Sequence, residues 1–337
     1  MPISRIAVLG TGANGAAVGA ALTRAGHDVV LIDQWTDNVQ AMQDRGVVVH
    51  AAGTATTTAV RAHPLSDVAT FREPFDLVVV GLKAYDTRWG TQLIEPLLAP
   101  DGVIVGMQNG MTIDTMAEVA GSHRTLGCVI EVAANMFVPG VVQQQAPLWF
   151  ALGAPRGGPQ DRAAEVAEVF AAAGTATVSD DIVSSKWMKL VANSSELVTS
   201  ALLDLPLADA IAVPGMFEFM LSAGEEAARA AVAAGSRIVP IFGMADADSL
   251  SPEQYARRLL DAVLGSYTLP DTLTTVLQDW RKGRRAEIED INGYVARAGA
   301  THGIAAPANA LVVELARRVE SGELVAGPAN AALMVRG

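Results

Sequence analysis

Cysteine is almost absent from this sequence, and its scarcity excludes a fold held together by disulfide bonds. The 337 residues include one cysteine, Cys128, so no disulfide can form within the chain. Proteins of oxidising compartments commonly depend on such bonds, so we expect a reducing compartment, the cytoplasm. The chain is long enough to form two domains, each with its own hydrophobic core.

Two further shortages narrow the range of partners. Lysine and arginine total 24 against 36 acidic residues, and the resulting net charge of −12 disfavours nucleic acid or an anionic membrane surface as a partner. No apolar run reaches the roughly 18 residues that a membrane span requires. The apolar stretch after Arg5 has no clear small-residue cleavage site behind it, so we interpret it as part of the fold. These shortages predict a soluble protein that binds small molecules.

What the sequence does contain is a glycine-rich turn between two apolar runs. Gly10, Gly12 and Gly15 are spaced as GxGxxG, directly after the apolar run 6–9. The first glycine permits a tight turn, the second lets a pyrophosphate approach the backbone, and the third lets helix and strand pack closely. The helix that follows directs its unpaired N–H groups at the phosphates. We predict a dinucleotide site here, which includes Asn14; the alternative is a glycine-rich turn between packed elements.

Asp33 indicates which dinucleotide is bound. It ends the second apolar run, 18 residues after Gly15. A carboxylate at this place can accept hydrogen bonds from the adenosine ribose hydroxyls, and it repels the 2′-phosphate of NADP. No lysine or arginine follows until Arg45. The sequence therefore favours NAD(H) over NADP(H), with the alternative that Asp33 only caps its loop.

Two later apolar runs, 75–82 and 103–107, also end in polar residues. Lys83 follows the first run and Asn109 ends the turn after the second. Ligands bind at the carboxyl ends of strands in open α/β sheets, so both side chains are candidates for the nicotinamide end of the cofactor. A solvated lysine and an ordinary Asn-Gly turn are the alternatives. We expect the apolar runs over 125–153 to be late strands of the same sheet.

Beyond Asp180 the pattern is almost wholly helical, and we place the domain boundary there. A helix is predicted over 184–200, in which Lys189, Asn193 and Glu196 share one face. A helix face with polar residues of this kind is usually exposed to solvent. The alternative is that these residues take part in catalysis.

A further helix is predicted over 285–300 and includes Glu287. The basic cluster before this helix suits a solvated helix end better than a phosphate site; its members are Arg281, Lys282, Arg284 and Arg285. Asp246 and Asp248 do not complete a calcium-binding spacing, so no metal site is predicted.

Five segments, in this order, resemble the ketopantoate reductase (2-dehydropantoate 2-reductase) family: GTGANG, LKAYDT, QNGM, WMKLVANS and TTVLQDWRKGRRAEIEDINGYVARAGATHGIAAP. The resemblance runs nearly end to end, and the last segment is the most specific. It implies an α/β fold with a Rossmann domain over 1–180 and an all-α domain over 181–337, of the 6-phosphogluconate dehydrogenase C-terminal type. It also implies an active site in the cleft between them, and an NAD(P)H-dependent reduction of a small anionic 2-oxo acid in pantothenate biosynthesis. The alanine-rich helices can pack internally or across a homodimer.

The same resemblance implies a role for each matching residue. Lys189 matches the catalytic lysine, the general acid toward the substrate carbonyl, and Glu287 matches the glutamate that binds the substrate near that carbonyl. Thr275 stands in for a serine that touches the substrate carboxylate. The implied substrate-binding residues are Asn193, Thr275, Asn109 and Glu196. The implied cofactor-binding residues are Gly10, Gly12, Asn14, Gly15, Asp33, Lys83, Asn109 and Glu287.

Two departures from the family pattern bear on substrate and cofactor. Leu197 occupies the place of a second substrate-binding asparagine on the lysine helix, and loss of such a hydrogen bond can change the substrate altogether. Members that use NADPH have an arginine near the place of Gln34. Three interpretations stay open: a ketopantoate reductase; a related NAD-dependent hydroxy-acid or alcohol dehydrogenase with another substrate; and a non-catalytic NAD-binding regulator.

Overall fold

The computed structural model describes residues 3–244 and 246–335, and the chain divides into two compact units. The first unit runs to Gln108 and resumes from Thr112 to Val183. The second consists of Asn109–Met111 and the chain from Ser184 onward. The turn Asn109–Met111 therefore belongs to the second unit, although the sequence on both sides of it belongs to the first.

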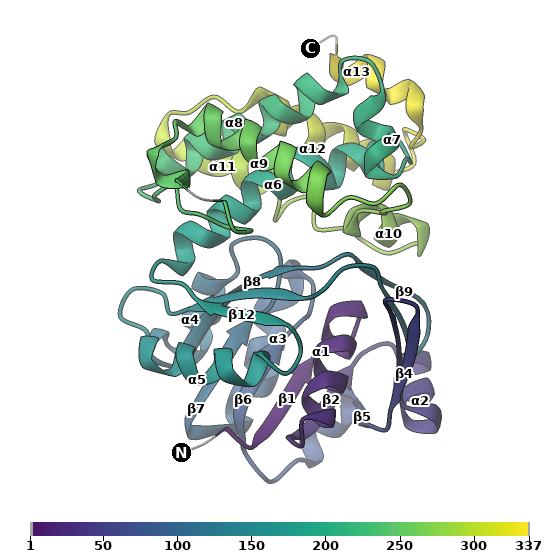
Figure 1. Ribbon diagram of the computed structural model, residues 1–337, viewed down its shortest axis with the longest axis vertical. Helices are drawn as coiled ribbons and strands as arrows, with labels where there is room; N and C mark the ends of the chain where they lie inside the picture. Colours follow the sequence, from purple (N-terminus) through teal and green to yellow (C-terminus); the bar gives the residue numbers. More distant parts are fainter. Residues whose placement is uncertain (1–2, 245, 336–337) are drawn as a thin grey trace. The chain divides into compact units, whose positions relative to one another are not determined.

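An eight-stranded sheet forms the centre of the first unit (Figure 1), in the order β12-β11-β8-β7-β6-β1-β2-β5. Its strands are β1 (Arg5–Leu9), β2 (Asp28–Asp33), β5 (Arg61–Pro64), β6 (Phe75–Val80), β7 (Leu98–Gly106), β8 (Thr125–Glu131), β11 (Trp149–Gly153) and β12 (Thr175–Val178). Neighbouring strands run parallel except β11, which is antiparallel to β8. The predicted Rossmann-type sheet is confirmed.

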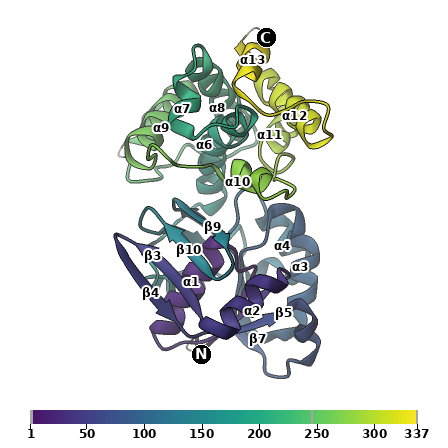
Figure 2. The same cartoon turned by 90° about the vertical axis from the view of Figure 1, so that its right-hand side faces the viewer.

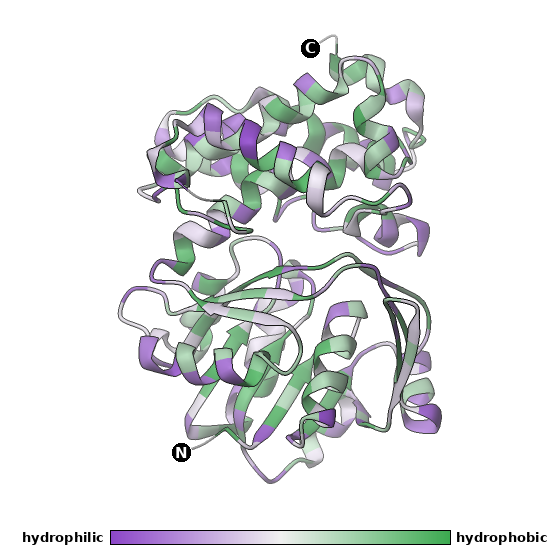
Figure 3. Cartoon of the chain, in the orientation of Figure 1, coloured by the Kyte–Doolittle hydropathy of each residue, from purple (hydrophilic) through white to green (hydrophobic). Residues whose placement is uncertain are grey.

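Helices cover both faces of this sheet because its central strands are apolar on both sides. In β1, Ile6 and Val8 pack into one core cluster, whereas Ala7 and Leu9 pack into a second cluster on the opposite face. The helices of this unit are α1 (Ala13–Arg24), α2 (Thr36–Arg45), α3 (Thr87–Ile94), α4 (Ile113–Ala120) and α5 (Gln160–Phe170). Helices α1 and α5 contribute to the first cluster, and α3 and α4 to the second. Figure 3 shows the hydrophobic strands between helices whose outer sides are hydrophilic.

A second, four-stranded sheet in this unit corrects one expectation. Its order is β4-β3-β10-β9, with strands β3 (Val47–Ala51), β4 (Thr54–Thr58), β9 (Ala134–Val138) and β10 (Val141–Gln144). Strands β3 and β4 form an antiparallel hairpin, whereas β9 and β10, which were expected as late strands of the main sheet, do not belong to it. Instead, β10 pairs in parallel with β3, and β9 and β10 lie beside β3 and β4 (Figure 2). Met136 and Val142 pack with Val47 in the core cluster that includes α1.

The second unit is all-α, as predicted. Its helices are α6 (Ile182–Leu202), α7 (Leu207–Ala212), α8 (Met216–Ala233), α9 (Pro252–Ser266), α10 (Thr275–Arg281), α11 (Asn292–His302), α12 (Pro307–Glu320) and α13 (Ala331–Val335). Short 3-10 helices occur in both units: η1 (Leu65–Thr70), η2 (Ala84–Asp86), η3 (Glu95–Leu97), η4 (Ser122–Arg124), η5 (Ala247–Ser249) and η6 (Pro328–Asn330). Over the described ranges, no helix has the length and apolar character to cross a membrane.

Glu287 does not lie in a helix, which corrects the prediction of a helix from Arg285. Helix α11 begins only at Asn292, and the Glu287 carbonyl accepts from the backbone N–H of Asp290 (3.1 Å) and Ile291 (3.0 Å). Ile291 has φ −105° and ψ −96°, a non-helical conformation that separates this turn from the helix. The turn therefore places Glu287 independently of the regular helix geometry.

Candidate active site

The glycine-rich turn has the geometry that a dinucleotide site requires. Gly10 has φ +93°, and a Cβ on it would lie 2.6 Å from the backbone nitrogen of Leu82. A Cβ on Gly15 would clash with the carbonyl oxygen of Gly10. Gly12, by contrast, caps α1, and a Cβ there would meet no atom within 4 Å. The open space at the helix N-terminus fits a phosphate group, and Asn14 lies in the first turn of the same helix.

Asp33 is buried and already holds the loop around it. Its carboxylate accepts from the N–H (2.5 Å) and the hydroxyl (2.7 Å) of Thr11 and from the N–H of Trp35 (2.8 Å). These three hydrogen bonds agree with the alternative that Asp33 caps its loop. A carboxylate has about four acceptor positions, so a further hydrogen bond from a ribose hydroxyl is compatible with these three. Arg45, the first basic residue after Asp33, donates to the carbonyl oxygen of Pro139 (2.6 Å).

Gln108 joins the ends of the two strands that precede Lys83 and Asn109. Its side-chain amide donates to the carbonyl oxygen of Leu82 (3.0 Å) and to the hydroxyl of Thr87 (2.9 Å). Lys83 itself is half-buried and immediately precedes η2. The sequence analysis did not predict this role for Gln108, since its amide could only be paired once the strand ends were adjacent.

Helix α6 is buried along almost its whole length, so the expectation of a solvated face is wrong. Asn193, Glu196 and Leu197 are 1%, 5% and 7% exposed, and Lys189 is half-buried. Lys186, one turn before Lys189, is also buried and was not singled out from the sequence. Burying polar side chains costs free energy unless they are paired. This concentration of buried polar side chains makes α6 a candidate for the functional site.

The Asn109 turn contacts this helix within the second unit. The Asn193 amide donates to the side-chain oxygen of Asn109 (3.1 Å). Gly110 has φ +73°, and a Cβ there would lie 2.9 Å from the carbonyl oxygen of Asp290. The turn is therefore closely packed as well as left-handed, and it lies beside the turn that carries the buried Glu287.

Thr275 lies where α10 begins, and α10 is fastened to α6. The hydroxyl of Thr274 donates to the carbonyl oxygen of Leu197 (3.0 Å) and lies 2.8 Å from the hydroxyl of Ser200. In the described part of the chain, the buried hydroxyl oxygen of Thr275 has no hydrogen-bond partner. An unpaired buried hydroxyl is costly and needs an explanation, and a bound ligand would provide one.

A buried polar network joins α8, α11 and α12 to the lysine helix α6, and it was not expected from the sequence. Glu226 of α8 accepts from the backbone N–H of Ala308 (2.9 Å) and from both the backbone N–H (3.0 Å) and the side-chain amide (2.8 Å) of Asn309. The Asn292 amide donates to Asn309 (2.9 Å) and to the carbonyl oxygen of Ser194 on α6 (2.8 Å). Asn292 belongs to the ING segment of the resemblance, which was the only available signal.

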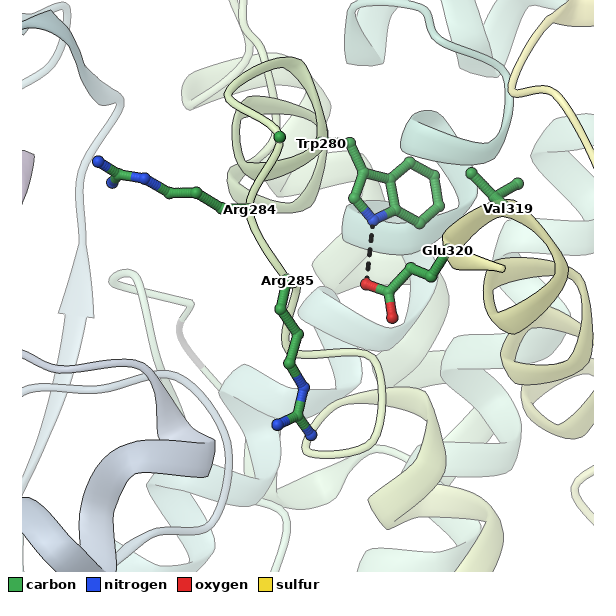
Figure 4. Close-up of a pocket in the computed structure, with 6 residues that line it drawn as sticks. Trp280, Arg284, Arg285, Val319 and Glu320 are labelled. Carbon is green, nitrogen blue, oxygen red and sulfur yellow. Dashed lines mark hydrogen bonds between the residues drawn. The ribbon is translucent and has the colours of Figure 1, made fainter. Parts of the chain in front are cut away.

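Two arginines of the basic cluster line a pocket of about 460 Å³ in the second unit (Figure 4). Its lining residues are Trp280, Gly283, Arg284, Arg285, Val319 and Glu320. The indole N–H of Trp280 donates to Glu320 (3.2 Å), which also accepts from the backbone of Ala286 (3.1 Å). Figure 4 shows the guanidinium groups extending away from this pair. Arg281 instead forms an ion pair with Asp204 (3.0 Å).

In the turn that follows Glu287, the ionised form of the Asp290 carboxyl is disfavoured. Burial raises the pKa of the Asp290 carboxyl above its ordinary value, and the negative charge of Glu287 raises it further, against the opposing effects of Arg297 and Arg285. Among the described residues, no group of three histidine, cysteine or acidic side chains is placed to hold a metal ion.

Comparisons with known proteins identify the family of the chain. The sequence model described as ketopantoate reductase PanE/ApbA matches residues 6–157, and its C-terminal counterpart matches residues 181–320. A 2-dehydropantoate 2-reductase of Archaeoglobus fulgidus is 26% identical over 325 residues, covering 96% of this chain and 100% of that protein. The crystal structure of a PanE/ApbA family ketopantoate reductase from Ralstonia eutropha JMP134 matches with a TM-score of 0.80 and 28% identity, covering 95% of this chain and 99% of that one.

A ternary structure of D-mandelate dehydrogenase with NADH and anilino(oxo)acetate has the same fold. Its TM-score is 0.84 over 94% of this chain and 99% of that chain, at 22% identity.

Proposed function

Because the chain belongs to the ketopantoate reductase family and is an NAD(P)-dependent oxidoreductase, we propose that it reduces the carbonyl group of a small 2-oxo acid, with Lys189 as the general acid. The observation that carries this proposal is the set of buried polar residues on α6 and in the adjoining turns. Asn193 and Glu287 are 1% and 3% exposed, and Lys189 shares the helix face of Asn193.

The chain's own residues would divide the work as follows. Gly12 and Asn14 at the start of α1 would hold the cofactor pyrophosphate, and Asp33 would accept from the adenosine ribose, which favours NAD(H). The bound nicotinamide supplies the hydride. Lys189 would donate a proton to the carbonyl oxygen and stabilise the negative charge that develops there.

Substrate orientation would fall to three further residues. The amide of Asn193 can donate to a substrate oxygen, and the hydroxyl of Thr275 can donate to the substrate carboxylate. Glu287 would accept a hydrogen bond from a hydroxyl group, in the alcohol that forms or elsewhere on the substrate. Orientation of this kind converts a bimolecular reaction into an effectively intramolecular one, which can lower the barrier by several kcal/mol.

The lysine assignment is tested by Lys189→Ala. We expect kcat to fall by roughly 10²–10⁴-fold, the usual contribution of a positioned general acid, while the Kd for NADH stays within about twofold because Lys189 is not among the residues expected to bind the dinucleotide. Initial rates of NADH and NADPH oxidation measure the first quantity, and fluorescence titration measures the second. Retention of most of the turnover would refute the assignment. If the wild-type protein binds NADH but turns over no 2-oxo acid, the non-catalytic regulator is favoured instead.

Leu197 favours a second candidate, a reductase or dehydrogenase of the same family whose substrate is not ketopantoate. Its side chain is only 7% exposed, so the place of a substrate-binding amide is filled by packed apolar atoms. A site that hydrogen-bonds a substrate hydroxyl discriminates strongly by that bond. Without the amide, selection for the hydroxyl of ketopantoate has to weaken.

The matched substrate pair for this candidate is ketopantoate and 3,3-dimethyl-2-oxobutanoate, which differ only in the hydroxyl group. We expect the wild-type protein to show no preference for ketopantoate in kcat/KM. Leu197→Asn should shift the ratio toward ketopantoate by about tenfold, the value of one good hydrogen bond to the substrate. A strong wild-type preference for ketopantoate would instead identify the protein as a ketopantoate reductase that tolerates Leu197.

A further inference from the structure

A strained turn in the second unit, between α8 and α9, carries an aromatic residue, Phe242. Ile241 to Met244 form a turn closed by a hydrogen bond from the Met244 N–H to the Ile241 carbonyl oxygen (3.1 Å). Its two central residues, Phe242 and Gly243, have φ +54° and +72°. Positive φ at both central positions is the signature of a type I′ turn, where glycine, asparagine and aspartate predominate. A phenylalanine in the left-handed region is strained.

This turn is fixed in place by its flanks. Ile241 and Met244 are both buried, so the turn cannot relax by swinging outward. Within the described ranges, the other residues with positive φ apart from glycines are Ala52, Asp204 and Asp246. Aspartate tolerates this region and alanine is small, so Phe242 is the bulky exception. Strain of this kind persists where the surrounding structure imposes it, and it is concentrated at functional sites.

The ring of Phe242 meets the proposed general acid. The ammonium nitrogen of Lys189 lies over the ring, 5.1 Å from its centroid, within the range of a cation–π interaction. The same ring also packs against the ring of Tyr267 at the end of α9. The two ring centroids lie 5.1 Å apart, and the angle between the ring planes is 47°. The ring of Phe242 therefore lies in contact with two other elements, α6 through Lys189 and the end of α9 through Tyr267.

We propose that Phe242 is a positioning residue for Lys189, and that the strained turn exists to hold its ring against the ammonium group. Lysine has a long, flexible side chain, and a general acid must be held within hydrogen-bond reach of the oxygen that it protonates. Glycine or asparagine at residue 242 would relax the turn but would remove the ring. The inference rests on the proposed role of Lys189.

The test uses three substitutions of Phe242 and one matched control in the full-length protein. Phe242→Leu keeps an apolar side chain but removes the π face, Phe242→Tyr keeps the ring, and Phe242→Asn relaxes the turn while removing the ring. The control is Phe217→Leu. Phe217 is also half-buried in the second unit and carries a cation–π contact with Arg257, 4.7 Å from the ring centroid, but it has no part in the proposed site.

We expect Phe242→Leu and Phe242→Asn to lower kcat by roughly 3- to 30-fold, the range that a cation–π interaction supports. The Kd for NADH should change less than about twofold, Phe242→Tyr should keep at least half of the wild-type kcat, and Phe217→Leu should leave it unchanged. Wild-type kcat in the Leu and Asn variants, or equal losses in the Tyr variant and the Phe217 control, would overturn the inference.

A second measurement does not depend on turnover. The melting temperatures of Phe242→Leu, Lys189→Met and the double variant form a thermodynamic cycle. The cation–π contact predicts that the shifts fail to add by roughly 1–4 °C. Additive shifts would overturn the inference even if Lys189 is confirmed as the acid. Non-additive shifts in a protein that reduces no 2-oxo acid would leave the contact established and reject the proposed function.

Discussion

At the scale of single residues, Asp290 shows how closely this site gathers negative charge. Its pKa is raised by burial and by Glu287, so the folded state binds the Asp290 proton more tightly than the unfolded state does. Stability therefore decreases as the pH rises from the ordinary aspartate value of 3.8 through the raised value, because the ionised form is disfavoured in the folded protein.

The corresponding prediction is that Asp290→Asn raises the melting temperature at pH 7 to 8, and that the gain disappears as the pH falls toward 4. Thermal unfolding at unit pH steps measures it. Glu253→Gln is the control with the opposite sign: a hydrogen bond from its own backbone N–H, and then the Ser251 hydroxyl and Arg229, lower the pKa of Glu253. Removing that charge should cost a little stability at pH 7 and nothing near pH 3. A gain for Asp290→Asn that is the same at every pH would show that packing, not ionisation, causes it.

At the scale of elements, the buried network determines where the helices of the second unit lie. Asn309, near the start of α12, is fully buried and forms hydrogen bonds with residues of both α8 and α11. Asn292 of α11 donates in turn to a carbonyl oxygen of α6. The Glu226 carboxylate also lies at the N-terminus of α12, where a negative charge is stabilised by the helix dipole. These hydrogen bonds therefore hold α6, the helix that carries Lys189, in place against the other helices of the unit.

We predict that Asn309→Ala lowers the free energy of unfolding by about 2–4 kcal/mol, since it removes several buried hydrogen bonds and leaves partners unpaired. Urea denaturation measures the change. Ser222→Ala, on the exposed side of α8, is the control and should stay within about 0.5 kcal/mol of the wild type. A loss for Asn309→Ala as small as that of the control would mean that the network contributes little to stability.

At the scale of the whole molecule, the residues of the proposed site are divided between the two units. The dinucleotide turn and Asp33 belong to the first unit, whereas Lys189, Asn193, Thr275 and Glu287 belong to the second, together with the turn at Asn109. Each unit has its own buried core. Because Asn109 and Glu287 of the second unit are also expected to touch the cofactor, the Kd for NADH is measured beside kcat in the experiments above.

The sequence by itself determined the features that depend on local spacing. The glycines at Gly10, Gly12 and Gly15, the strand that ends at Asp33, the hairpin of β3 and β4 and the capping box at Ser251 all follow from short-range sterics and hydrogen bonding, and the structure has each of them. The five segments that resemble the family also predicted that the second half of the chain is all-α.

Only the tertiary structure decided the rest. Burial of the Lys189 face, the pairing of β10 with β3, the network through Asn309 and the contact of the Phe242 ring with Lys189 each depend on residues that are far apart in the chain. Periodicity reports which side chains share a face, but not what covers that face. A helix that is polar on one side has the same sequence pattern whether water or another helix lies against that side. Only the packing in the tertiary structure distinguishes the two cases.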